Sequence, residues 1–274
     1  MSPAPRPAWS LGSLGLRLAG LFGHAGHFAL LAWRVAALMA RSLWDPKARP
    51  SRRDIVRQCH FVGVQSLPVV MTTGAFAGMV LAYSFYFQFQ QFGVQSLTGA
   101  LVAKALVWQL GPVLAGLMLA GRVGCAMTAE LGSMTVTEQV DAMKTMGVDP
   151  VRELVFPRVA ALTLMTPVLT MFANAIGIGA GILLTVVLGA DWHFLNEQIT
   201  AFMVPYDHVY SLSKGLVFGL TIGVISCGRG LDTTGGAEGV GLATTEANVW
   251  SSISVLIINF LMTMLLVFFD PKGW

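Results

Sequence analysis

The chain has 274 residues, of which 55% are hydrophobic and only 11% are charged, with a formal net charge of +3. Soluble domains carry about 25% charged residues, so this composition and the mean hydropathy of +0.68 argue against a soluble enzyme. Because a spanning helix needs roughly 20 apolar residues, the length allows about five or six spans with short loops. The sequence therefore predicts an integral membrane protein without a large domain outside the membrane.

The N-terminal part is basic: nine of the 17 lysines and arginines precede residue 58. The positive-inside rule places this end in the cytoplasm. Nucleic-acid binding is the alternative, but no aromatic or glycine-rich RNA-binding signature accompanies the basic residues. Residues 11–41 are apolar, with basic residues gathered on one side of a helix, which predicts a helix lying in the membrane interface. A cleaved signal peptide is disfavoured because these basic residues run through its would-be core: Arg17, His24, His27, Arg34 and Arg41.

Uncharged stretches predict five transmembrane helices after a polar link at 45–54. We expect spans at about 60–87, about 100–121, within 159–190, at about 209–228 and at 247–269. The predicted organisation is thus a cytoplasmic N-terminus with the interfacial helix at 1–54 and a five-span membrane domain at 55–274, with the cytoplasmic loop at 122–158. With five spans, the C-terminus lies outside.

The predicted loops alternate in charge as this topology requires. Charged residues at 122–158 and 229–246 predict cytoplasmic loops, and a glutamine-rich patch near 88–95 predicts an outer loop. The next outer loop is acidic, with Asp191, Glu197 and Asp207. Lys104, Lys214 and Lys272 are expected outside or at span ends. Small-residue repeats within the spans predict close helix contacts: Gly74/Gly78, Gly177/Gly181 and Gly215/Gly219/Gly223.

No catalytic constellation is evident. Cys59, Cys125 and Cys227 are widely separated and predict neither a metal site nor a disulfide. The histidines have no partner at metal-ligand spacing, and the chain lacks a phosphate-binding G-x-x-x-x-G-K-[ST] loop. We therefore expect no metal and no cofactor in this chain, with any ATP and Mg²⁺ bound by a partner. The predicted spans lack charge, which argues against an ion-coupled carrier; Gln109, Asn174 and Asn259 are interpreted as helix-packing hydrogen-bonding residues.

The segment at 128–150 is the most informative. Thr135 and Glu138 have the spacing of a capping box, and Gly147 and Pro150 predict the end of the helix that it starts. The result is a helix of about 11 residues with Val140 on its apolar face and an acidic opposite face. Such a helix in a cytoplasmic loop is suited to docking a second protein, and a loop helix that touches only lipid is the alternative.

Residues 111–158, GPVLAGLMLAGRVGCAMTAELGSMTVTEQVDAMKTMGVDPVRELVFPR, resemble the signature of the MlaE/YrbE permeases, the membrane subunits of MCE-associated ABC transporters. Residues 233–249, TTGGAEGVGLATTEANV, resemble the second cytoplasmic loop of the same family. The resemblance extends from about residue 50 to the C-terminus. It implies an ABC-transporter permease fold in a bacterial inner membrane.

The resemblance also implies a function and partners. The expected activity is movement of phospholipids between the inner and outer membranes, which maintains outer-membrane lipid asymmetry. The expected partners are a cytoplasmic ABC ATPase dimer, a STAS-domain protein, a periplasmic MCE-domain hexamer, phospholipid and a second copy of this chain. The residues expected to couple to the ATPase are Glu130, Thr135, Glu138, Asp141 and Lys144.

One departure from the family pattern concerns the lipid site. The family often has R-E-L-G-P at the start of the second span, whereas this chain has Trp108 and Gln109 before Leu110-Gly111-Pro112. An aromatic ring and a neutral amide thus replace a charged pair. The expected lipid-binding residues are Leu81, Trp108 and Gln109. Two other functions remain open on the sequence: an autonomous secondary transporter or channel for an apolar solute, and a membrane anchor that only assembles other proteins.

Overall fold

The computed structural model describes residues 30, 33–34, 37–38 and 52–268. Regular structure in this part of the chain is helical throughout, with no strand. Five stretches are long and apolar enough to cross a membrane: Arg53–Gln90, Gln95–Val136, Val151–Val187, Pro205–Leu231 and Gly236–Phe268. The predicted all-α fold with five spans is therefore confirmed. The interfacial helix predicted at 11–41 lies largely outside the described residues.

The first stretch consists of α2 (Arg52–Gly63) and α3 (Leu67–Gln90), joined by a short turn. Pro68 is tolerated because it lies in the first turn of α3, where backbone N–H groups have no helical partner. The predicted span at 60–87 crosses this turn and ends too early. Since α3 continues to Gln90, the outer loop predicted near 88–95 contains only residues 91–94. Gly93 allows the chain to turn there, with a φ of 71°.

The second stretch is one long, locally irregular helix. Its parts are η2 (Gln95–Leu97), α4 (Thr98–Ala105), η3 (Leu106–Leu110), α5 (Gly111–Leu119), η4 (Ala120–Gly124) and α6 (Cys125–Val136), with η3 and η4 being π-helical turns. The predicted cytoplasmic loop at 122–158 is therefore wrong over its first 15 residues. Charge does not end the helix there because the charged groups have partners: Arg122 donates to Ser66 Oγ at 2.7 Å, and Glu130 pairs with Arg158 at 2.9 Å.

The remaining elements are α7 (Gln139–Thr145), the π-helical turn η5 (Val151–Val155), α8 (Phe156–Val187), α9 (Trp192–Phe202), α10 (Pro205–Leu231) and α11 (Gly236–Phe268). The predicted loop at 229–246 is mostly helix, and only residues 232–235 connect α10 to α11. Two consecutive left-handed residues, Gly235 and Gly236, make this short reversal possible. The predicted acidic outer loop contains α9.

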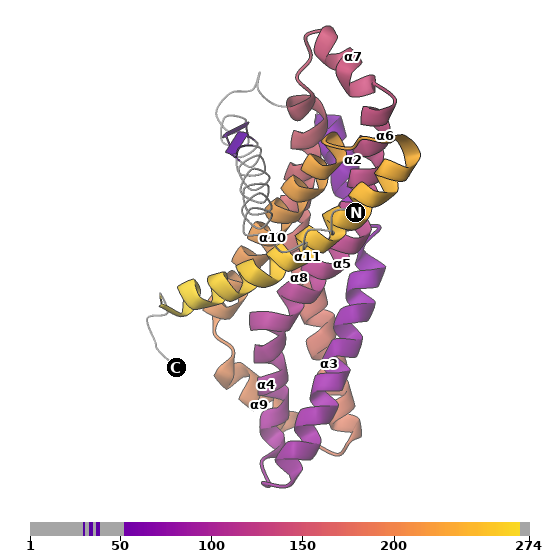
Figure 1. The fold of residues 1–274 in the computed structure, drawn as a ribbon. Coiled ribbons are helices and arrows are strands. Elements are labelled where there is room, and N and C mark those ends of the chain that lie inside the picture. Colours follow the sequence, from indigo (N-terminus) through magenta and orange to yellow (C-terminus); the bar gives the residue numbers. More distant parts are fainter. Residues whose placement is uncertain (1–29, 31–32, 35–36, 39–51, 269–274) are drawn as a thin grey trace, which may run out of the picture.

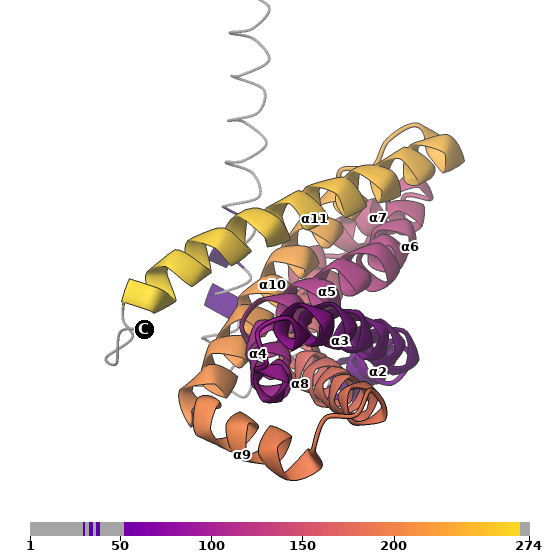
Figure 2. The same cartoon turned by 90° about the horizontal axis from the view of Figure 1, so that it is seen from below.

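The helices form an elongated bundle with α7 and α9 at opposite ends (Figure 1). Helix α11 crosses one face diagonally, and viewed from below it lies along the edge of the bundle, away from α3 and α8 (Figure 2). Its apolar side chains, among them Leu256, Phe260 and Met264, are mostly exposed. The core lies instead among α3, α5, α8 and α10 and includes Val70, Leu119, Leu162, Phe218 and Ile222.

Small residues bring the spans into backbone contact, as the glycine repeats predicted. A Cβ on Gly78 would lie 1.9 Å from the carbonyl oxygen of Gly177, so α3 and α8 could not approach this closely with larger residues. Helix α10 packs on α8 in the same way, where a Cβ on Gly219 would lie 2.6 Å from the carbonyl oxygen of Leu162. These contacts fix α8 between α3 and α10.

Candidate functional site

A lysine lies inside the fourth span. Lys214 is fully buried in α10, nine residues after Pro205 and thus roughly 13 Å along the helix. A charged side chain at such a depth is costly and rare in membrane spans and is a functional-site hypothesis by default. The expectation that Lys214 lies outside or at a span end is wrong, and so is the inference that the spans carry no charge.

The Lys214 ammonium is surrounded by neutral oxygen atoms. Its Nζ donates to the Thr263 hydroxyl at 2.8 Å and the Asn259 side-chain carbonyl at 2.9 Å, both on α11. On the second stretch it donates to the Trp108 backbone carbonyl at 2.9 Å and to Gln109 Oε1 at 3.0 Å. Among the described residues it forms no ion pair. The Lys214 side chain therefore crosslinks three helices through neutral acceptors only.

The π-helical turn η3 explains how a backbone carbonyl can serve this lysine. In a π turn the chain contains one extra residue, and such turns recur at functional sites. The turn spans Leu106–Leu110 and so includes both Trp108 and Gln109. From this turn the Trp108 carbonyl and the Gln109 side-chain oxygen both accept hydrogen bonds from Lys214 on α10.

Gln109 completes the polar group. Its Nε2 donates to Thr263 Oγ1 at 3.1 Å, and its Oε1 accepts from Asn259 Nδ2 at 3.1 Å as well as from Lys214. The interpretation of Gln109 and Asn259 as helix-packing hydrogen-bonding residues is confirmed. Asn174 is the third such residue, and it donates to Ser211 Oγ at 3.0 Å.

A second charged group lies nearer the start of α10. Asp207 is buried and accepts hydrogen bonds from the Trp108 indole and, at 3.0 Å, from the Val204 backbone N–H. Lys104 Nζ lies 3.7 Å from its carboxylate and 4.8 Å from the centre of the Trp108 ring. The same ring stacks on Tyr210 at 4.9 Å. Asp207 is therefore part of α10, not of an outer loop.

The sequence contained a signal for both missed residues. Pro205 followed two positions later by an acidic residue is a typical helix start, because proline suits the first turn and a carboxylate can cap free N–H groups. Applied at Pro205, this rule starts the fourth span four residues earlier than hydropathy does. Lys214 then falls in the third turn of the helix.

The three expected lipid-binding residues do not lie together. Trp108 and Gln109 belong to the polar groups around Asp207 and Lys214. Leu81 packs instead against an apolar cluster with Val102 and Leu106. The sequence resemblance therefore identified two residues of a polar site and one residue of a neighbouring apolar contact.

The five expected coupling residues also divide into two sets. Asp141 and Lys144 are exposed on α7 and pair with each other at 2.8 Å. Glu138 precedes α7 and has a left-handed backbone, with a φ of 61°. Glu130 and Thr135 instead make contacts within the bundle, Glu130 with Arg158 and Thr135 with the carbonyl oxygen of Gly230.

The predicted capping box is wrong. The Thr135 hydroxyl donates to the Leu131 carbonyl at 2.9 Å, and Glu138 makes no side-chain cap hydrogen bond. Thr135 is unavailable as a cap because α6 continues past it to Val136. As a result α7 has seven residues, Gln139–Thr145, and not about 11. The predicted stop at Gly147 is confirmed by its φ of 76°.

The described residues contain no group of three or more His, Cys, Asp or Glu side chains that could hold a metal ion. Cys59 and Cys125 are half-buried, Cys227 is buried, and all three are free thiols.

Comparison with known proteins identifies the family. Residues 55–265 match the model of the family described as Permease MlaE. The chain is 44% identical over 220 residues to a "Probable ABC transporter permease protein" of Rickettsia felis, covering 77% of this chain and 82% of the relative. It is 34% identical over 235 residues to the "Intermembrane phospholipid transport system permease protein MlaE" of Haemophilus influenzae, covering 84% and 88%. It is also 36% identical to the chloroplastic protein TRIGALACTOSYLDIACYLGLYCEROL 1 of Arabidopsis thaliana, covering 81% and 63%. With most of its length matched and its five helical stretches in order, this chain belongs to the MlaE permease family.

Proposed function

We propose that this chain is the membrane permease subunit of an ABC transporter that moves phospholipids between the inner and outer membranes and so maintains outer-membrane lipid asymmetry. The observation that carries the proposal is the family match over residues 55–265, which covers three of the five spans completely and nearly all of the first and the last. A relative that matches over most of its length is named as an intermembrane phospholipid transport permease. A cargo with two acyl chains also suits a membrane protein whose spans are largely uncharged.

We assign no catalytic step to this chain. ATP and Mg²⁺ bind to a cytoplasmic ABC ATPase dimer, which docks on α7 and its flanking residues. The position of α7 beyond the ends of the long helices supports this assignment (Figure 1). So do the exposed side chains of Asp141, Lys144 and Met146, while the buried Val140 attaches α7 to the protein. ATP-driven movement of the partner is thus transmitted from α7 to α6, which is the last part of the second helical stretch.

The lipid path passes along the first, second and fifth spans, with Trp108 and Gln109 contributing from η3 and Leu81 from α3. The chain forms a homodimer, and the exposed apolar side chains of α11 are available to pack against the second copy. The remaining partners are a STAS-domain protein on the ATPase and a periplasmic MCE-domain hexamer. These assignments follow the family resemblance.

The proposed location is the bacterial inner membrane, with the N-terminus in the cytoplasm and the C-terminus in the periplasm. Basic residues favour this orientation, because cytoplasmic ends of spans carry the excess of lysine and arginine. Three basic residues lie toward the α7 end of the molecule: Lys144, Arg152 and Arg229. Lys104 lies toward the opposite end, near α9.

An autonomous secondary transporter or channel is the second candidate, and one observation favours it. Lys214 is an ionisable group buried within a span, which is typical of carriers that couple to ions. Its four neutral hydrogen-bond acceptors favour a structural and orienting role over a proton relay, because none of these four groups takes up a proton near neutral pH.

Two measurements test the proposal. The tagged chain is purified from native membranes in mild detergent, and the proteins that accompany it are identified by mass spectrometry. Recovery of an ABC ATPase and an MCE-domain protein is expected. Reconstituted with that ATPase, the chain should move fluorescent phospholipid only when ATP is present. A chain reproducibly free of any ATPase that transports solute without nucleotide would refute the proposal in favour of the autonomous carrier.

A further inference from the structure

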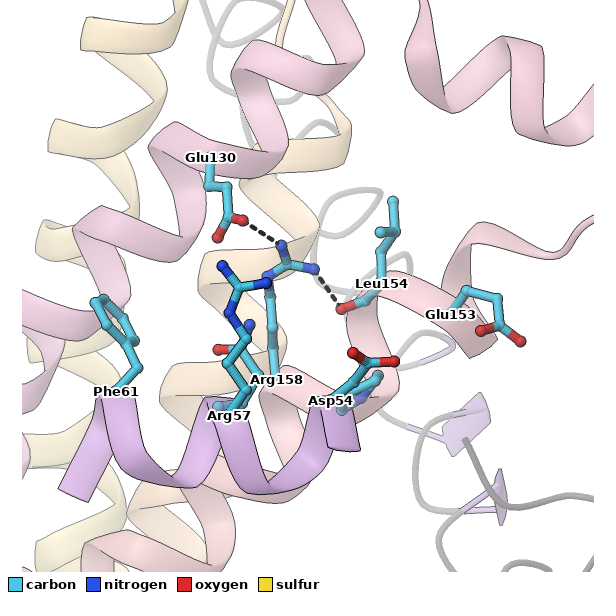
Figure 3. Close-up of a pocket in the computed structure, with 9 residues that line it drawn as sticks. Asp54, Arg57, Phe61, Glu130, Glu153, Leu154 and Arg158 are labelled. Atoms are coloured by element: carbon cyan, nitrogen blue, oxygen red, sulfur yellow. Dashed lines mark hydrogen bonds and ion pairs between the residues drawn. The ribbon is translucent and has the colours of Figure 1, made fainter. Parts of the chain in front are cut away.

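A cavity of about 530 Å³ lies at the α7 end of the bundle, where α2, α6 and the start of α8 meet (Figure 3). It shares no residue with the polar groups around Lys214 and Asp207. Its walls carry charges of both signs. Arg57 from α2 and Arg158 from α8 provide the positive charges, and Figure 3 shows their guanidinium groups beside each other.

The two arginines have fewer partners than their donors require. Arg158 is only 5% exposed, and it is held by Glu130 at 2.9 Å and by the Leu154 carbonyl at 2.7 Å. Its buried Nε has no hydrogen-bond acceptor in the described part of the chain. Arg57 forms no ion pair among those residues. Glu130 pairs with Arg158 only, whereas Arg57 beside it is exposed, so the positive charge of Arg57 is available to an anionic group.

Acidic side chains supply the opposite charge in the same cavity. Asp54 has no ion-pair partner among the described residues, and Glu153 lies 3.9 Å from Arg152. In the view of Figure 3 both carboxylates lie on the Leu154 side of the two guanidinium groups. The cavity is lined by two arginines and three carboxylates, so charges of both signs face the same space. A ligand that carries both charges can therefore pair with both sets of side chains.

The cavity continues into a surface suited to acyl chains. Pro157, which lines the cavity, precedes Leu164 by seven residues, so the two lie on the same face of α8, roughly two turns apart. Leu164 is 57% exposed, and Val168, one turn further, is also exposed. At the end of α2, Val64 is exposed as well. A charged cavity directly above exposed apolar side chains has the pattern of a lipid headgroup above its acyl chains.

We propose that this cavity binds the headgroup of an aminophospholipid, with the phosphate between Arg57 and Arg158 and the primary ammonium at Asp54. Phosphoethanolamine has this combination of a phosphate and an amine that donates hydrogen bonds. The site holds a lipid of the leaflet at the α7 end and is separate from the proposed transport path. It stands whether or not this chain transports lipid.

The test measures lipid binding to the purified, delipidated full chain by native mass spectrometry. Phosphatidylethanolamine, phosphatidylcholine and phosphatidylglycerol of the same acyl composition are added in equal amounts. We expect phosphatidylethanolamine to be retained preferentially. Arg57→Ala and Asp54→Asn should each reduce its retention roughly tenfold, the factor expected for losing one charge-assisted hydrogen bond. The matched control is Arg53→Ala, which removes an exposed α2 arginine outside the cavity and should leave retention unchanged.

Several results would overturn the proposal. Equal retention of the three lipids, or unchanged retention in both cavity variants, would show that the cavity does not select this headgroup. Displacement of the lipid by an equal concentration of soluble glycerophosphoethanolamine would show that the ligand is a water-soluble molecule and not a lipid. Loss of a co-purifying protein from Arg57→Ala, with lipid retention unchanged, would assign the cavity to a protein partner.

Discussion

Replacing Gly78 by alanine tests whether backbone contact between α3 and α8 holds the bundle together. The new Cβ would lie 1.9 Å from the Gly177 carbonyl oxygen, whereas ordinary contact begins at 3.4 Å, so the helices must separate by about 1.5 Å. Overpacking of this kind costs about 1–3 kcal/mol, and alanine returns up to about 1 kcal/mol through its higher helix propensity. Because the clash is with a backbone atom, the upper end of the overpacking cost applies, and we expect a net loss of about 2 kcal/mol. Such a loss lowers the melting temperature by about 4–8 °C in a chain of roughly this size.

The assay is thermal unfolding of the detergent-solubilised protein. Its readout is the fraction of protein that remains monodisperse after heating to each temperature. The matched control is Gly179→Ala on α8, where an added Cβ would meet no atom within 4 Å. This variant gains helix propensity without a clash and should melt at or slightly above the wild-type temperature. Equal melting temperatures for the two variants would refute the claim that the α3–α8 contact is a close backbone contact.

Three further predictions concern the polar site and α7. Lys214→Met keeps the length of the side chain but leaves the Trp108 carbonyl and the Asn259 side-chain carbonyl without their donor. We therefore expect the free energy of unfolding to fall by at least about 2 kcal/mol, measured by thermal unfolding. A stability equal to that of wild type would contradict the hydrogen-bond network. Glu138→Gly should raise stability by about 1 kcal/mol in the same assay because glycine adopts the left-handed backbone without strain, whereas Glu138→Val should lower it. The double variant Glu138→Lys with Asp141→Lys should insert normally but lose the co-purifying ATPase, and undiminished ATPase recovery would exclude α7 as the docking helix.

The membrane class and the order of the five spans followed from the sequence alone. Hydropathy determines them because each span must satisfy its backbone hydrogen bonds within a helix in apolar surroundings, which requires a long, predominantly apolar stretch. The glycine repeats likewise predicted close contacts, since only small residues permit them. Gly147 predicted the end of α7 because a left-handed residue at that position favours glycine.

The ends of the spans were predicted less well. The second span was expected to end at Arg122 because a charge in a helix resembles a boundary when its partners are unknown. In the structure Arg122 bonds to Ser66, and Glu130 bonds to Arg158, residues that are distant in the sequence. The helix therefore continues to Val136, and Thr135 contacts α10 where the sequence predicted a helix cap.

The candidate site depends on the tertiary structure for the same reason. Trp108 and Gln109 were singled out by their departure from a family pattern, but nothing local indicated that they face Lys214. The sequence determined that this chain is a helical membrane protein of five spans, because hydropathy and small-residue spacing act within each helix. Only the packing of α10 and α11 against the π-helical turn η3 decided that a lysine could be buried in a span, because its four acceptors come from segments up to 106 residues away.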